Sequence, residues 1–168
     1  MLMSELYECL AKGDMKGFRA ALDTASIDDL KGVLVTSAEC GNLDVVKLLT
    51  QRGIYDSWAI VSASSYGRLD VIRYLLQHGA GNRKAALIGA AAHGKLEAVK
   101  LLMQDGFSDT NEALADAAMR GYLDIVVFLT EHGGDITAPV YNSETAVSLA
   151  WKHGHKDVCA YFDKVLKG

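Results

Sequence analysis

Five segments of this chain share one phrase, which opens with a glycine and continues through an acid and a run of aliphatic residues. The copies read GNLDVVKLLTQRG, GRLDVIRYLLQHG, GKLEAVKLLMQDG, GYLDIVVFLTEHG and, more weakly, GHKDVCAYFDKVL. Their leading glycines are Gly41, Gly67, Gly94, Gly121 and Gly154, separated by 26, 27, 27 and 33 residues. A degraded first copy, GDMKGFRAALD, begins at Gly13. Self-similarity at this period predicts an array of stacked structural units.

Each phrase has the spacing of a helix. Counted from the leading glycine, apolar residues fall mostly at offsets 2, 4, 5, 7 and 8, which gives a helix with a broad buried face. An acid occupies offset 3, in the first turn, where the helix dipole favours negative charge. In the first four copies a second glycine follows, and glycine is the residue that most often ends a helix.

A second helical segment precedes each leading glycine. It carries an apolar anchor seven residues upstream of that glycine: Leu6, Leu34, Ile60, Leu87, Leu114 and Val147. Small residues dominate three and four residues upstream: Ser37 and Ala38, Ala63 and Ser64, Ala90 and Ala91, Ala117 and Ala118. We expect the N-caps of these segments at Ser4, Ser57, Asp109 and Ser143. Each unit is therefore predicted to be a helical hairpin with the leading glycine in its turn.

The side chains of the two helices predict how the hairpins stack. Small residues let neighbouring first helices approach closely, whereas Leu and Val hold the second helices further apart. The array should therefore curve, with the first helices on the concave side. Because one hairpin cannot bury its own apolar face, we expect a single domain over residues 1–168. Its units span approximately residues 4–29, 30–56, 57–82, 83–109, 110–136 and 143–168, with the first and last as caps.

The order anchor-x-x-Ala-Ala-x-x-Gly-x-Leu-Asp-Val-Val-x-x-Leu-Leu-x-x-Gly resembles the ankyrin repeat. The resemblance implies an all-α solenoid of about six helix-turn-helix repeats that binds protein partners. The chain departs from the family in lacking its Thr-Pro-Leu-His motif, of which only Thr145-Ala146 is similar, and in having one proline, Pro139. The linkers between hairpins are also short. We therefore expect the projecting β-hairpin fingers of the family to be missing, except for at most one in residues 133–144.

The resemblance implies binding through the fingers and the exposed surface of the first helices. With the fingers missing, the first helices remain. The position before each leading glycine holds Lys12, Cys40, Tyr66, His93, Arg120 and His153, with no acid, in a chain of net charge −4. Aromatic and arginine side chains are effective interface anchors. The predicted partner-binding residues are Tyr55, Trp58, Tyr66, His93, Met119, Arg120, Lys152 and His153. The alternative is that basic residues here only complement helix C-termini.

Other functional classes find little support in the residues. An acidic chain argues against a general nucleic-acid binder, and the apolar run Ala85–Ala92 is too short to span a bilayer. The start of the chain has no pattern of a secretory signal. Cys9, Cys40 and Cys159 show neither disulfide nor metal spacing, which indicates free thiols and a cytoplasmic location. His153, His155 and Cys159 have the right types for zinc but match no established spacing. We expect no metal, no cofactor and a monomer.

The sequence thus predicts a non-catalytic scaffold for protein–protein interaction. The alternative is a regulatory inhibitor or a host-directed effector or targeting module of a microbe or virus. An enzyme would need a polar cluster, and the best candidate is His93, Asp116, Met119 and Arg120, which lacks a nucleophile. Trp151 stands where the other units have a small residue, and we expect it to cap the last hairpin.

Overall fold

The computed structural model describes residues 2–79 and 81–167. Over these ranges it contains twelve α-helices, two short 3-10 helices and no β-strand. The elements are α1 (Leu2–Lys12), α2 (Met15–Leu22), α3 (Ile27–Cys40), α4 (Leu43–Gln51), α5 (Ser57–Ser65), α6 (Leu69–Gln77), α7 (Arg83–Ala92), α8 (Leu96–Leu102), η1 (Gln104–Gly106), α9 (Asn111–Arg120), α10 (Leu123–Glu131), η2 (Tyr141–Ser143), α11 (Ala146–His153) and α12 (Lys156–Val165).

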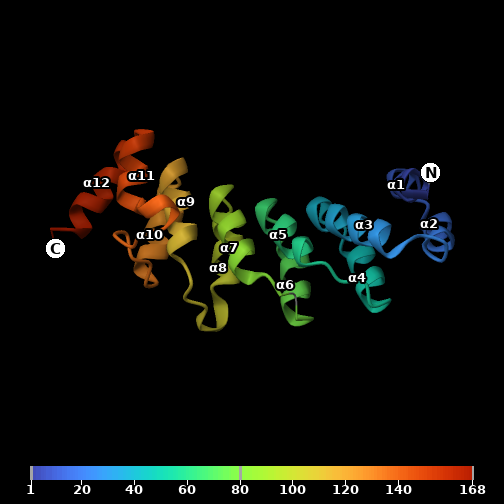
Figure 1. Ribbon diagram of the computed structural model, residues 1–168. Helices are drawn as coiled ribbons and strands as arrows, with labels where there is room; N and C mark the ends of the chain where they lie inside the picture. The colour runs from blue at the N-terminus through green and yellow to red at the C-terminus, as the bar shows by residue number, and fades with distance from the viewer. Residues whose placement is uncertain (1, 80, 168) are drawn as a thin grey trace.

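The helices form two rows, as Figure 1 shows. The odd-numbered helices are the first helices of the hairpins and form one row, and the even-numbered second helices form the other. Each hairpin packs against the hairpins before and after it in the chain. The described residues therefore confirm the predicted fold class, an all-α solenoid of stacked helical hairpins.

Small side chains draw the first helices together. Ala38, Ala63, Ala91 and Ala118 are completely buried between neighbouring first helices. From α3 to α11 the contacts within the first row are more extensive than those within the second row. The first row accordingly lies on the inner side of the gently curved array (Figure 1).

The buried side chains form one apolar cluster that runs through the whole array. The predicted anchors Leu6, Leu34, Ile60, Leu87 and Leu114 are all at most 1% exposed. Val147 differs, because it is only partly buried. In the last hairpin Ala146, Leu149 and Ala150 turn into the core instead.

The turn of each hairpin is covered by the hairpin that follows. The leading glycine adopts a positive φ, 79° at Gly121 for example, which a residue with a side chain rarely adopts. A side chain from the turn of the following hairpin lies over each of four leading glycines. These pairs are Arg68 over Gly41, Lys95 over Gly67, Tyr122 over Gly94 and His155 over Gly121. His155 also donates from Nε2 to the carbonyl oxygen of Met119, at 2.9 Å. The turns thus add polar contacts to the apolar stacking.

Replacing Gly121 with alanine should destabilise the protein more than replacing Gly154. Both glycines have positive φ, near 78°, so either alanine costs about 1–2 kcal/mol of backbone strain. A β-carbon at Gly121 would also overlap the ring of His155, whereas one at Gly154 meets nothing within 4 Å. Urea unfolding followed by circular dichroism gives both losses, and equal losses would contradict the role of His155 at this turn.

The predicted helix caps were wrong by one or a few residues. Asp56 caps α5 by accepting from the backbone N–H of Trp58 at 2.7 Å, and Ser57 is already the first helical residue. α9 begins after Thr110, and Ser4 lies within α1. Each start offers several neighbouring cap residues, and the packing of the helix decides among them.

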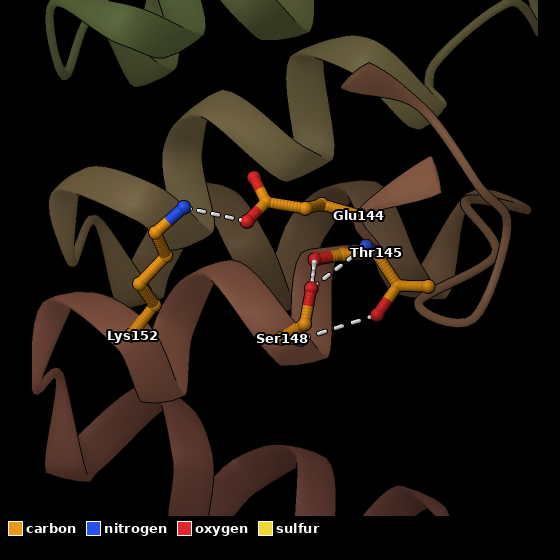
Figure 2. Close-up of polar contacts among 4 residues, drawn as sticks. All are labelled: Glu144, Thr145, Ser148 and Lys152. Atoms are coloured by element: carbon orange, nitrogen blue, oxygen red, sulfur yellow. Dashed lines mark hydrogen bonds and ion pairs between the residues drawn. The ribbon is translucent and has the colours of Figure 1, made fainter. Parts of the chain in front are cut away.

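The cap of α11 lies two residues beyond the predicted Ser143. The Thr145 hydroxyl accepts from the Ser148 backbone N–H at 3.1 Å, and the Ser148 hydroxyl accepts from the Thr145 N–H at 2.9 Å (Figure 2). This reciprocal pair is a capping box, with serine in the place of the usual glutamate.

The long loop before α11 is not a finger. Residues 133–145 contain no strand, so the single β-hairpin that the sequence allowed there is absent from the described residues. Ile136 is 5% exposed and anchors the loop to the core. The Asp135 backbone N–H donates to Asn111 Oδ1 at 2.9 Å, and the Val140 N–H donates to the Glu144 carbonyl oxygen at 2.8 Å. The Asn111 contact and the burial of Ile136 hold the loop against the array, and the Val140–Glu144 bond closes the loop on itself.

Candidate partner-binding surface

Four of the predicted binding residues form a row along the inner surface. Tyr66, His93, Arg120 and His153 all lie at the C-terminal ends of first helices, on α5, α7, α9 and α11. All four are exposed, Tyr66 to 51%. Because successive first helices pack side by side, these residues are neighbours across the array. We call this set the inner row.

His93 has a local role as well as an exposed position. Its Nδ1 donates to the carbonyl oxygen of Gly89, one turn back on α7, at 2.8 Å. His78 and His132 make the same bond at the ends of second helices, to Tyr74 and Phe128. The Nδ1 of His93 thus satisfies a carbonyl group at the end of α7, as the alternative interpretation of these residues expects. In the neutral ring Nε2 is then an acceptor.

Trp58 and Tyr55 lie toward the start of α5, at the opposite end of that helix from Tyr66. Trp58 is 61% exposed and belongs to the first turn of α5. It borders an open hollow of about 590 Å³ on the first-helix surface, together with Tyr7, Lys31 and Val35. Tyr55 lines a separate hollow of about 190 Å³ beside the linker ends.

The hollow at Trp58 has a fixed floor. The hydroxyl groups of Tyr7 on α1 and Thr36 on α3 share a hydrogen bond of 3.0 Å. Thr36 also donates to the Gly32 carbonyl oxygen at 3.0 Å. This hydrogen bond links α1 to α3 beside the hollow.

Met119 and Lys152, two further predicted binding residues, both make contacts within the array. Met119 is half-buried, and its carbonyl oxygen accepts from His155. Lys152 forms an ion pair with Glu144 at 2.6 Å, which Figure 2 shows reaching across the start of α11. Its charge is therefore partly matched within its own hairpin.

Acidic side chains lie on the first helices before the inner row, and sequence reasoning missed Glu112 among them. Lys84 on α7 pairs with Asp109 and Glu112, with N–O distances of 3.1 and 2.9 Å. Asp116 lies one turn before Arg120 on α9. Comparing the positions at the starts of the first helices, and not only at their ends, would have found Lys84 and Glu112.

The pKa values of Asp116 and Tyr141 are both affected by these acidic residues. Burial raises the pKa of the Asp116 carboxyl and Glu112 raises it further, while Arg120 and His93 lower it. Burial also raises the pKa of the Tyr141 phenol, with Asp116 and Glu112 adding to the effect. The structure therefore does bring Asp116 near Arg120 and His93, as the catalytic alternative requires, but Met119 contributes only a half-buried side chain there.

Asp116→Asn should stabilise the fold at neutral pH. A carboxyl whose pKa rises on folding holds its proton to a higher pH in the folded state than in the unfolded state. Its contribution to the free energy of unfolding is therefore full below the ordinary pKa of 3.8 and is lost as the pH rises through the raised pKa. The advantage of asparagine should therefore appear above about pH 4 and grow until the folded carboxyl is ionised. Thermal unfolding of both proteins at several pH values tests this, and an asparagine variant that is less stable at pH 7 would contradict it.

Tyr66 is oriented by the preceding hairpin. The Glu39 carboxylate beside it raises the pKa of the Tyr66 phenol, which therefore stays protonated and able to donate. Arg68 donates from Nε to the Glu39 carbonyl oxygen at 2.7 Å. The start of the inner row is thus linked to α3.

The possible zinc ligands do not converge. His155 donates to Met119, His153 is exposed, and Cys159 is 4% exposed with a pKa raised by burial. Among the residues that the structure describes, no group of three or more His, Cys, Asp or Glu side chains is arranged to hold a metal ion. In the same residues, no helix is long and apolar enough to cross a membrane.

The fold and the exposed inner row define a helical repeat protein with a continuous surface along its first helices. The family model of ankyrin repeats, three copies long, matches residues 60–140 and 87–164, which together cover more than half of the chain. The chain belongs to the ankyrin repeat family. Ankyrin repeats generally mediate protein–protein interaction, and their proteins are typically non-enzymatic scaffolds. Comparison with curated proteins finds no match.

Proposed function

We propose that this protein is a non-catalytic scaffold that binds a protein partner along the inner row, with the separate hollow at Trp58 as a second contact. The observation that carries the proposal is the row of exposed Tyr66, His93, Arg120 and His153 on closely packed first helices. In the described residues no finger projects beyond this surface. The three cysteines are free thiols, which supports a cytoplasmic site of action.

The binding mechanism follows from rigidity and from a few anchors. A stacked array loses little conformational entropy when it binds, so more of the contact energy appears as affinity. The Trp58 indole and the Tyr66 phenol each offer a large apolar area with a polar edge. The planar Arg120 guanidinium can bind a carboxylate through two hydrogen bonds. These features favour an extended, acidic segment of the partner that crosses successive first helices.

The acidic residues Asp109, Glu112 and Asp116 limit where on the first helices an acidic segment can bind. An acidic segment is attracted by Arg120 and repelled by the carboxylates that lie toward the helix starts. The segment should therefore follow the C-terminal ends of the first helices. Complementary charge of this kind mainly determines specificity and the rate of association.

The proposal is tested by capturing partners from the native lysate and identifying them by mass spectrometry. The triple variant Tyr66→Ala, His93→Ala, Arg120→Ala should then bind the captured partner at least about tenfold more weakly in calorimetry. The matched control, Arg73→Ala, Gln77→Ala, Glu131→Ala, changes three exposed residues of the second row and should bind normally. Full affinity in a folded triple variant would remove the inner row as the site.

The captured partner also separates the scaffold from the alternative predicted from the sequence. If the partner is an enzyme whose turnover falls on binding, the protein is a regulatory inhibitor. If the partner comes only from a host cell lysate, the protein is a host-directed effector. A partner that keeps its activity and recruits a third protein supports the scaffold.

A further inference from the structure

The last hairpin presents a surface that every other hairpin covers with its successor. Three residues before the leading glycine, the second to fifth hairpins have Ala38, Ser64, Ala91 and Ala118, all completely buried. At the same position the last hairpin has Trp151, and its side chain is 60% exposed. Figure 1 shows α11 and α12 at the end of the array, with no helix beyond them among the described residues.

This end face combines an apolar centre with opposite charges. A hollow of about 440 Å³ lies between α11 and α12, and its lining consists of Trp151, Gly154, Lys156, Cys159, Ala160 and Asp163. Cys159 and Ala160 form its floor between Lys156, at the start of α12, and Asp163, two turns later. Leu166, 56% exposed, follows three residues after Asp163 and so extends the same side of the helix.

The bulk of Trp151 limits what can cover this face. In the other hairpins the next first helix packs against a small side chain at this position. At the end face the indole of Trp151 occupies the space that such a helix would need. The covering surface must instead accept a protruding aromatic ring. It must also place an acid against Lys156 and a base against Asp163. Neither of these two charges forms an ion pair with another residue of the described part of the chain.

We propose that the occupant is a second copy of this chain, related by a two-fold axis that passes near Ala160. An antiparallel approach of two α12 helices sets Lys156 against the partner's Asp163, and Asp163 against the partner's Lys156. Each Trp151 then packs against the α12 helix of the other copy. Such a contact is isologous, so it closes at two subunits. The end face meets all three requirements with its own residues, because it carries the ring, the hollow and both charges.

This dimer replaces the monomer that the sequence predicts, and it does not depend on the proposed function. The end face lies at one end of the array, whereas the inner row runs along its side. A dimer of this kind carries two inner rows. It would therefore bind a partner with two acidic segments more tightly than one segment alone, through effective concentration.

Sedimentation equilibrium of the purified chain tests the interface. We expect a monomer–dimer equilibrium whose dissociation constant rises at least about tenfold in Trp151→Ala, because a buried tryptophan at the centre of an interface is a typical hot spot. Trp58→Ala is the matched control, because it removes an equally exposed tryptophan from the first-helix surface and should leave the equilibrium unchanged. A chain that stays monomeric near millimolar concentration, a dimer that tolerates Trp151→Ala, or assembly beyond two subunits overturns the proposal.

Charge exchange distinguishes this interface from any other that contains Trp151. Lys156→Asp alone and Asp163→Lys alone each place like charges opposite each other twice, and each should weaken the dimer by on the order of tenfold. The double variant Lys156→Asp, Asp163→Lys restores both attractive pairs and should dimerise like the unchanged chain. A mixture of the two single variants should form the heterodimer in preference to either homodimer. If the double variant and the mixture fail to recover dimerisation, the antiparallel pairing is wrong.

Discussion

Ala118→Leu should lower the free energy of unfolding by about 3 kcal/mol, the upper part of the range for overpacking a core. Ala118 is completely buried on α9, which packs closely against α11. A leucine there has no space unless the two helices separate, and the helices cannot separate without opening the core on both sides. Urea unfolding followed by circular dichroism measures the loss.

The control for this substitution lies at the same repeat position. Trp151→Ala changes a much larger side chain, but at 60% exposure it should alter stability by only about 0.5 kcal/mol in dilute protein. If Ala118→Leu unfolds at the urea concentration of the unchanged chain, close approach of the first helices is not what small residues provide here.

Leu114→Ala should cost about 2–5 kcal/mol, the range for removing a buried leucine that leaves a cavity. Leu114 has no exposed surface and lies beside Gly134, at the start of the long loop. Because each hairpin is stabilised by its neighbours, weakening α9 should also weaken the contact with the α11–α12 hairpin. In the variant, amide hydrogen exchange should therefore speed up, relative to the unchanged chain, more in residues 146–165 than in α3 or α5.

Val147→Ala is the matched control for Leu114→Ala, because it occupies the anchor position of the last hairpin. Val147 is only partly buried, so its truncation should cost less than about 1.5 kcal/mol. Equal losses at the two positions would show that the anchors contribute through helix formation and not through burial.

The repeat unit could be predicted because its signals recur. The leading glycines, Gly121 among them, lie in the predicted turns, where they adopt positive φ, and the small residues before them are buried. The caps were harder, because Asp56 and Ser57 are both good cap residues and only packing chooses between them. The long loop was harder still. Its folded form depends on Ile136 entering a core that several hairpins build together.

The candidate surface was predictable in part. Exposure of Tyr66, His93 and Arg120 follows from their place at helix ends, where the chain turns away from the core. The contacts of Lys152 and Lys84 do not follow from the repeat. They depend on how far a side chain reaches across a loop or to the next hairpin, and that distance is set by the stacking of the helices.

The covered turns have a consequence for the length of the array. The residue that lies over a leading glycine is arginine, lysine, tyrosine or histidine in four successive junctions, and the glycine beneath is the same each time. The contact between two successive turns therefore needs a glycine in the first turn and a long or flat side chain in the second. Hairpins on either side of a removed or duplicated unit would meet compatible surfaces, so this protein should tolerate the loss or gain of a whole internal unit better than the loss of a few residues within one.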